Sequence, residues 1–224
     1  AIRPVPLTAE ETSDYIKKDA LQTKKKSKKY LDSIDNKRNK FSISNIITGY
    51  SYSNTYKKWS LNYDGSLFST SFNTVQGWKL QVGFSFNKRD EEKRSFTRIA
   101  SKLDYGFSEN KLRATVNYFH KFNSKDNSII SFSGGSSVNQ FNQSNPISDK
   151  INTVSSLFFK NNFMKLYEKE FVEIGTGREV VNGLFLNANL AYENRKPLFN
   201  TTDQSWVNTD DVYSSNNPLN PNSD

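Results

Sequence analysis

The stretch Trp78-Lys79-Leu80-Gln81-Val82-Gly83-Phe84-Ser85-Phe86-Asn87 alternates without a break between apolar and polar side chains. Successive side chains of a β-strand point to opposite faces of a sheet, so this alternation predicts a strand with one apolar and one polar face. The pattern recurs clearly in 59–67, 97–107, 112–122 and 184–193, and more weakly in 42–53, 128–138 and 170–180. These segments predict about eight strands and a mainly β fold.

Short polar segments connect the predicted strands. Turns such as Ser108-Glu109-Asn110 and Val181-Asn182-Gly183 are typical of hairpins, which predicts an antiparallel meander. Strand parity then places the connections 54–56, 90–93, 124–127 and 181–183 at one end of the sheet, and 68–76, 108–110 and 139–168 at the other.

Residues 139–168 interrupt the two-residue rhythm. Pro146 ends one segment, and 151–168 carries apolar side chains at helical spacing, namely Val154, Leu157, Phe158, Phe163, Met164 and Tyr167. This pattern predicts one amphipathic helix. Its apolar face suits burial in a core, and it also suits a position at a membrane interface.

Residues 1–40 form a short helical, lysine-rich linker in this interpretation. Thr8-Ala9-Glu10-Glu11 is a capping box that predicts a helix over roughly 9–21. Residues 24–40 then hold eight basic and two acidic side chains, which account for most of the net charge of +8. Such a run suits an anionic partner, either lipid head groups or nucleic acid, and it also suits a solvated linker helix.

The 224-residue chain is polar for a folded protein, with 34% hydrophobic residues and a mean hydropathy of −0.76. Aromatic residues nevertheless make up 14%, which argues against a disordered chain. The sequence has no cysteine and a single histidine, so disulfides, thiolate zinc sites and two-histidine sites are excluded. No signal peptide opens the chain and both of its ends look open, so we expect a piece of a longer protein.

A soluble β-sandwich and a membrane β-barrel both have one apolar face per strand, and three features favour the barrel. The strands run about 10–12 residues, the length that a tilted strand needs to cross a bilayer. Aromatic side chains gather near strand ends, where barrels have interfacial girdles: Trp59, Trp78, Tyr105, Phe107, Tyr118, Phe122 and Tyr192. The opposite face carries charges that suit a wet lumen: Arg98, Lys102, Asp104 and Arg113. The alternative is a soluble secreted sandwich that binds carbohydrate through Trp59, Trp78 or Trp206.

Five stretches carry a resemblance to a known family: Arg3–Thr8, Phe72–Trp78, Lys165–Lys169, Lys196–Asp203 and Ser215–Leu219. The chain resembles a Bacteroidota outer-membrane family of unknown function, in which a carboxypeptidase-regulatory-like domain precedes a linker and a C-terminal outer-membrane β-barrel. The resemblance implies that 1–40 is the linker and that 41–224 is a partial transmembrane barrel of about eight strands, continuing beyond the chain. It also implies a place in the outer membrane, with lipid and periplasmic or outer-membrane proteins as partners. If the linker is periplasmic, the turns at 54–56 and 181–183 face the cell exterior.

The sequence shows no constellation of catalytic, cofactor-binding or metal-ligating residues. Gly175-Thr176-Gly177 lies within an alternating strand rather than before a helix, and Gly134-Gly135 indicates a bend or bulge. His120 falls on the apolar face of its strand, where packing explains it. Asp203, Asp210 and Asp211 could bind calcium in a loop, but they lack the spacing of an EF-hand.

We therefore expect a non-enzymatic outer-membrane barrel segment that acts in transport or in outer-membrane assembly and scaffolding. We expect no catalytic residue, cofactor or metal. Nucleic acid is not an expected partner, because the basic charge lies in the linker while the aromatic side chains lie on strands elsewhere.

Overall fold

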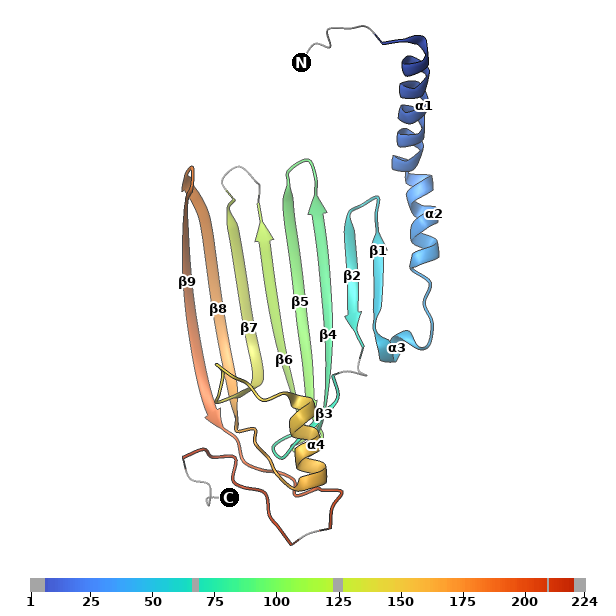
Figure 1. Cartoon of the computed structure of the whole chain (residues 1–224). Helices are drawn as coiled ribbons and strands as arrows, with labels where there is room; N and C mark the ends of the chain where they lie inside the picture. Colours follow the sequence, from blue (N-terminus) through green and yellow to red (C-terminus); the bar gives the residue numbers. More distant parts are fainter. Residues whose placement is uncertain (1–6, 66–68, 123–126, 209, 220–224) are drawn as a thin grey trace.

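The computed structural model describes residues 7–65, 69–122, 127–208 and 210–219. These residues form one antiparallel sheet of nine strands, accompanied by four helices (Figure 1). The strands are β1 Tyr50–Asn54, β2 Trp59–Asp64, β3 Ser71–Asn73, β4 Gly77–Asp90, β5 Ser95–Gly106, β6 Lys111–Lys121, β7 Ile129–Gln140, β8 Leu166–Val181 and β9 Leu184–Pro197.

The predicted meander is confirmed. The strands neighbour one another in the order β1-β2-β4-β5-β6-β7-β8-β9, with β3 paired to β4 beside this path. The sheet does not close, since β1 and β9 stand at its two opposite edges. An open, curved meander of this kind is compatible with part of a barrel.

Two strand predictions need correction. The expected strand 42–53 begins only at Tyr50, because Asn45–Thr48 form the short helix α3 and Gly49 turns the chain at a φ of +100°. The additional strand β3 is three residues long, too short to show an alternation in the sequence. The sheet therefore has nine strands rather than about eight.

The connections lie at the two ends that strand parity predicts (Figure 1). The hairpin end carries the short turns 55–58, 91–94 and 182–183. The α4 end carries the turn 107–110 and the long connection 141–165, which contains helix α4. Residues 124–126 of the remaining predicted turn lie outside the described residues.

Helices α1 (Ala9–Lys26) and α2 (Lys28–Arg38) form an N-terminal arm. The predicted capping box is present, since Glu11 N donates to Thr8 Oγ1 at 3.2 Å and Thr8 N donates to Glu11 Oε2 at 2.9 Å. The first helix extends to Lys26 rather than to residue 21, because lysine is a good helix former. Ser27 then ends α1 and caps α2.

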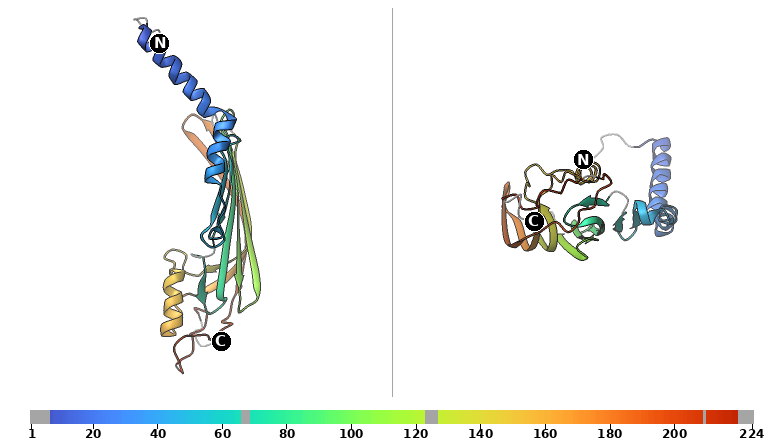
Figure 2. Two further views of the ribbon diagram at one scale, coloured as in Figure 1. Left: turned by 90° about the vertical axis from the view of Figure 1, so that its right-hand side faces the viewer. Right: turned by 90° about the horizontal axis from the view of Figure 1, so that it is seen from below.

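The N-terminal arm does not lie at the end of the sheet where the linker was expected. Figures 1 and 2 show that α1 projects past the hairpin end of the sheet, because α2 runs back alongside β1. The arm therefore lies at the same end of the sheet as the hairpin turns, whereas the expectation placed the linker at the opposite end. None of the described helices is long and apolar enough to span a membrane.

Helix α4 spans Asp149–Phe159, so the helix predicted over 151–168 is shorter than expected. Lys160 ends it in a left-handed conformation at a φ of 54°, and Leu166 already begins β8. Figure 2 shows α4 and the C-terminal segment on the concave side of the curved sheet. Of the apolar set predicted for this helix, Leu157, Met164 and Tyr167 are buried, whereas Val154, Phe158 and Phe163 are exposed.

Buried side chains concentrate at the α4 end rather than along the whole sheet. The buried apolar residues there are Phe72, Val75, Leu157, Met164, Leu166, Tyr167 and Tyr213. Within the described residues, no second sheet packs on the convex face, as the alternative β-sandwich would require.

Candidate functional site

The convex face of the sheet is apolar from edge to edge. On the concave side, Lys79 pairs with Asp149 of α4 at 2.7 Å, so the alternation places Trp78 and Leu80 on the convex side. The five apolar residues predicted to share a face on β4 therefore lie on it together. Cross-strand register extends this face to Tyr52, Leu61, Phe84, Ile99, Val116, Phe132, Ile174 and Leu190.

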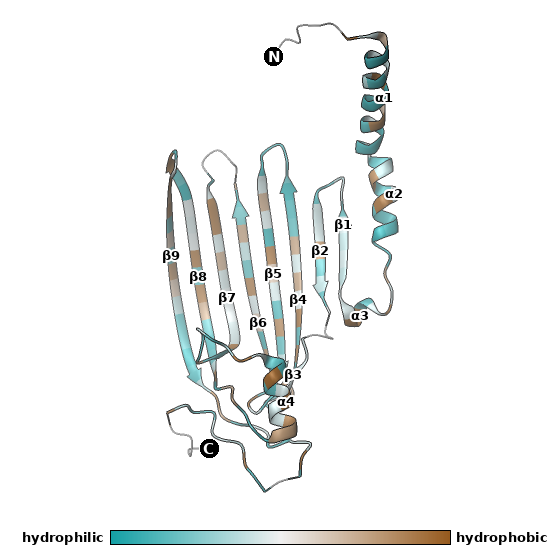
Figure 3. Ribbon diagram, viewed as in Figure 1, coloured by the Kyte–Doolittle hydropathy of each residue, from teal (hydrophilic) through white to brown (hydrophobic). Residues whose placement is uncertain are grey.

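The eight residues named last have exposed side chains. They are 37% to 75% exposed, and Figure 3 shows the apolar bands alternating with polar ones along the strands. A continuous exposed apolar surface of this extent is rare on soluble monomers and marks contact with protein or lipid. From Trp78 to Phe86 the apolar residues of β4 span about 27 Å along the strand. That length is close to the apolar band of about 25 Å on transmembrane barrels.

Aromatic rings mark both ends of this face. Trp59 begins β2 and stacks on Tyr52 at 5.4 Å between ring centroids, whereas Trp78 lies at the opposite end, 6.3 Å from Trp206. Most of the predicted aromatic set lies at or next to a strand end: Trp59, Trp78, Tyr105, Phe107 and Phe122. Tyr192 is a correction, because its pairing with Val172 places it well inside β9 rather than at a strand end.

The concave face carries the charged residues predicted for it. Asp104 faces Gln81 on one neighbouring strand and Arg113 on the other, while Arg98 and Lys102 share its face. Arg98 and Lys102 are exposed, but Arg113 is buried at 1% exposure, so the expectation of a wet surrounding is wrong for Arg113. Strands β7 to β9 continue the face with small and amide side chains: Ser131, Ser133, Gly175, Gly177, Asn187 and Asn189.

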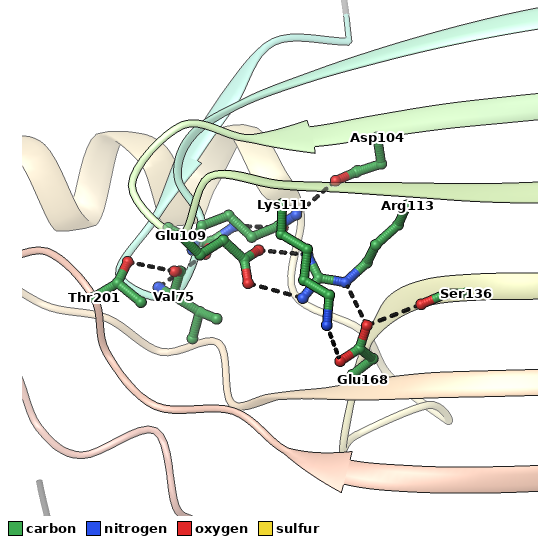
Figure 4. Close-up of polar contacts among 10 residues, drawn as sticks. Val75, Asp104, Glu109, Lys111, Arg113, Ser136, Glu168 and Thr201 are labelled. Carbon is green, nitrogen blue, oxygen red and sulfur yellow. Dashed lines mark hydrogen bonds and ion pairs between the residues drawn. The ribbon is translucent and has the colours of Figure 1, made fainter.

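Arg113 is the centre of a buried ion-pair network (Figure 4). Its guanidinium forms a bidentate pair with Glu109, and its Nε donates to Glu168 Oε1 at 3.0 Å. Glu168 also accepts from Lys111 Nζ at 2.7 Å and from Ser136 Oγ at 2.9 Å. Each buried charge thus has an opposite charge and further hydrogen bonds, which is the condition for burying it.

The network lies where the sheet splits. The ladder between β6 and β7 ends at Thr115 and Gly135, although β6 stays paired with β5 as far as Lys111. Gly135 has a φ of +134°, and a Cβ there would overlap the carbonyl oxygen of Ala114. The bend predicted at Gly134-Gly135 is therefore present. Beyond it, side-chain ion pairs rather than a backbone ladder join β6 to β8.

Two polar cavities lie on the concave face beside this split. Their volumes are about 430 Å³ and 340 Å³. The residues that line both are Lys79, Gln81, Val138, Asn139 and Lys169. Charged and amide groups dominate this shared lining, so the hollow of the sheet is hydrophilic.

A buried polar turn closes the α4 end of the concave face. Every residue from 71 to 77 is buried. Asn73 Oδ1 accepts hydrogen bonds from Val75 N at 3.0 Å and Gln76 N at 2.8 Å, the arrangement of an Asx-turn. Thr201 covers the turn from outside, donating through N to Thr74 O at 2.9 Å and through Oγ1 to Val75 O at 2.6 Å. We call this turn, together with α4 and residues 198–208 and 210–216, the basal knot.

Asn152 of α4 is the internal support of the basal knot. It is fully buried, and its Oδ1 accepts from Phe163 N and Met164 N, both at 3.1 Å. Its Nδ2 donates to Asn162 Oδ1 at 3.0 Å. Asn162 Nδ2 in turn donates to Thr74 Oγ1 at 2.6 Å, so one chain of side-chain amides ties α4 to the buried turn.

Four of the five stretches that carry the family resemblance meet in the basal knot. Phe72–Trp78 contains the turn itself, and Lys196–Asp203 supplies Thr201. Asn216 of the last stretch accepts from Leu166 N at 2.8 Å and donates to Leu166 O at 2.7 Å, which joins it to Lys165–Lys169. Residues 1–6 of the first stretch lie outside the described residues. The resemblance therefore maps onto one structural unit.

The calcium hypothesis for Asp203, Asp210 and Asp211 gains no support. Asp203 pairs with Lys160 Nζ at 3.0 Å, and Lys160 lies over the ring of Tyr213 at 4.7 Å. Burial, followed by the charge of Asp203, raises the pKa of Tyr213 to about 12. Across the described ranges, no three His, Asp or Glu side chains gather closely enough to hold a metal ion.

His120 lies on the convex face, as the alternation predicts. Its Nδ1 is 2.8 Å from Thr97 Oγ1, and its ring packs on Phe122 at 4.5 Å between centroids. Tyr118 stacks beside it. These neighbours are those of a packing histidine.

Comparisons with known proteins place the sheet in a family. Comparison with curated proteins gave no match, and comparison with solved structures gave none either. Residues 44–224 match the C-terminal domain of a family of unknown function, DUF5686, over a range that includes every strand of the sheet. This match covers more than half of the chain, so the protein belongs to the family of unknown function DUF5686 through its C-terminal domain.

Proposed function

We propose that the sheet is part of an outer-membrane β-barrel, with its convex face against lipid and its concave face lining a hydrophilic lumen. The convex face carries this proposal, because it stays apolar and exposed from Tyr52 on β1 to Leu190 on β9. Transmembrane barrels combine such an outer face with a polar interior. The paired charges and the amides of the concave face suit that interior.

The open edges of the sheet support the same proposal. In lipid, every backbone N–H and C=O needs a partner, so a sheet crosses a membrane as a closed barrel. Because β1 and β9 are not paired with each other, further strands are needed for closure. The 14-residue strand β9 offers a template of suitable length.

The lengths of the connections support one orientation in the membrane. Outer-membrane barrels have short periplasmic turns and longer extracellular loops. The hairpin end has short turns such as 182–183, whereas the α4 end has the long connection 141–165. In the proposed orientation the hairpin end and the arm are periplasmic, and the basal knot faces the exterior.

The proposed role is non-enzymatic, in transport or in outer-membrane assembly and scaffolding. The hydrophilic cavities suit the passage of polar solutes, and the projecting arm suits docking of a periplasmic protein. Planar-bilayer conductance of the full-length protein separates the two roles. Channel steps support a solute pore, and a silent bilayer supports assembly or scaffolding.

Two adjacent substitutions in β6 test the membrane proposal. Val116 and Asn117 are both exposed, the first on the convex and the second on the concave face, in the middle of the sheet. In a bilayer, Val116→Arg is expected to cost about 2–4 kcal/mol, since arginine then faces hydrocarbon. Asn117→Arg faces the lumen and is expected to fold normally.

The readout is folding of the full-length protein in the outer membrane, followed by heat-modifiable migration on a denaturing gel. We expect parent and Asn117→Arg to fractionate with the outer membrane and to be heat-modifiable, and Val116→Arg to lose both properties. Equal behaviour of the two variants would contradict the lipid-facing assignment, because in water both would be ordinary surface substitutions.

A further inference from the structure

The two edges of the sheet differ in what lies beside them. Strand β9 is exposed along nearly its whole length of 14 residues, from Leu184 to Pro197. Strand β1 has five residues, and helix α2 packs beside it (Figure 1). A free strand edge is a template for pairing with another strand. Helix α2 therefore stands where a further strand would pair with β1.

Asn39, at the end of α2, takes the place of a strand residue at the outer edge of β1. Its Nδ2 donates to Ser53 O at 2.7 Å, and its Oδ1 accepts from Ser53 N at 3.0 Å. An antiparallel neighbour makes the same two hydrogen bonds with the residue opposite it. The backbone N–H and C=O groups of successive strand residues point to opposite sides. Those of Ser51 and Ser53 therefore point away from the sheet, and those of Tyr50 and Tyr52 point toward β2.

Asp35 extends this cover toward the hairpin end. It is buried at 5% exposure, and its carboxylate accepts from Thr55 N and Thr55 Oγ1, each at 2.6 Å. Tyr50 Oη donates to Asn39 O at 2.7 Å, which fixes the end of the helix against β1. Side chains of α2 and its C-cap thus satisfy backbone groups that another strand would otherwise bind.

We propose that the outer edge of β1 is the docking site of the strand that closes the barrel, and that α2 is a placeholder which this strand displaces. The inference rests on the proposed function. The closing strand runs antiparallel to β1, with apolar side chains beside Tyr50 and Tyr52 on the convex face. It carries polar side chains beside Ser51 and Ser53 on the concave face.

The charge of α2 supports its displacement. The helix carries Lys28, Lys29, Lys37 and Arg38, and it lies beside a strand of the proposed barrel wall. Placing such charges in the hydrocarbon region is costly. A closing strand pairs the whole β1 edge, including Ser51, and moves α2 off the proposed barrel wall.

Two disulfide variants of the full-length protein test this inference. The sequence has no cysteine, so each variant holds a single defined pair. Asn39→Cys with Ser53→Cys locks α2 onto the outer edge of β1. Ser51→Cys with Asn62→Cys joins the directly opposed residues of β1 and β2 and leaves the outer edge free. Both are exported to the oxidising periplasm and compared with the cysteine-free parent.

We expect the oxidised Asn39–Ser53 lock to abolish the heat-modifiable form, and reduction before folding to restore it. The oxidised Ser51–Asn62 control should match the parent. If the oxidised lock is as heat-modifiable as the control, α2 stays on β1 in the closed barrel and the inference is wrong, while the proposed function stands. If the parent itself lacks a heat-modifiable form, the proposed function fails and the inference fails with it.

Discussion

Glu168 of β8 binds Arg113 of β6 although β7 lies between their strands in the sheet. Glu168 Oε1 and Arg113 Nε are 3.0 Å apart, and both side chains are almost completely buried. The contact spans the region where the β6–β7 ladder has already ended at Thr115 and Gly135. This ion pair, together with that of Lys111 and Glu168, therefore joins two parts of a sheet that the backbone ladder no longer joins there.

Glu168→Gln is expected to lower the free energy of unfolding by about 3 kcal/mol, because removing one partner of a buried ion pair leaves the other charge undercompensated. Glu109 still neutralises part of the Arg113 charge, which keeps the effect at the low end of the usual range. Urea unfolding of the full chain measures the change.

The matched control is Glu170→Gln, two residues along the same strand. Glu170 pairs with Lys196 at the exposed surface, where ion pairs contribute little, so no measurable change is expected. Equal midpoints for the parent and Glu168→Gln would show that the network does not stabilise the split.

Gly135→Ala is expected to destabilise the sheet more than Gly183→Ala. Both glycines have a positive φ, +134° and +84°, which costs an alanine roughly 1–2 kcal/mol. At Gly135 the new Cβ would also overlap Ala114 O, whereas at Gly183 it meets nothing within 4 Å. Urea midpoints of the two variants separate the steric cost from the backbone strain. A Gly135→Ala midpoint equal to that of Gly183→Ala would show that the split region relaxes freely.

The strands could be predicted from the sequence because alternation is a local property. From Trp78 to Phe86 on β4, apolar and polar side chains alternate, which by itself predicts a strand with one apolar and one polar face. The short turns predict the antiparallel order of the strands. The three-residue strand β3 could not be predicted, because Ser71–Asn73 are strand only through pairing with β4 and packing on α4.

The polar networks could be predicted only in part. The shared concave face of Asp104 and Arg113 follows from alternation. The pairing of Arg113 with Glu168 does not, because the two residues are 55 positions apart in the sequence and meet only where the sheet splits. The spacing of Glu109 and Arg113 across a hairpin turn is a signal that points to their pairing, and the sequence analysis missed it. Asn152 and Asn39 act through tertiary contacts with backbone groups, for which the local pattern has no signature.

Asn152→Ala is expected to loosen the basal knot. The substitution leaves Phe163 N and Met164 N without their acceptor, and at the buried Met164 an unsatisfied N–H costs about 1–3 kcal/mol. We expect faster cleavage of the 141–165 connection by a protease in limiting amounts, with the strands left intact. Asn161→Ala is the control, because Asn161 is exposed and its hydrogen bonds to Ser155 and Ser156 use its backbone. Equal cleavage rates for the two variants would contradict the supporting role of Asn152.

Tyr213 is expected to ionise at a higher pH than an ordinary tyrosine. Its ionisation is therefore expected to make the free energy of unfolding depend on pH in the alkaline range. Burial and the charge of Asp203 raise its pKa from 10.0 to about 12, so the folded protein holds this proton more tightly than the unfolded chain. The resulting contribution to stability is fully present below pH 10 and is lost as the pH rises toward 12. Tyr213→Phe cannot ionise, so its stability relative to the parent should rise across this window. Ultraviolet difference titration of parent against variant, alongside urea unfolding at each pH, measures both effects. A difference titration centred near pH 10, with a stability gap independent of pH, would contradict the burial of this phenol in the basal knot.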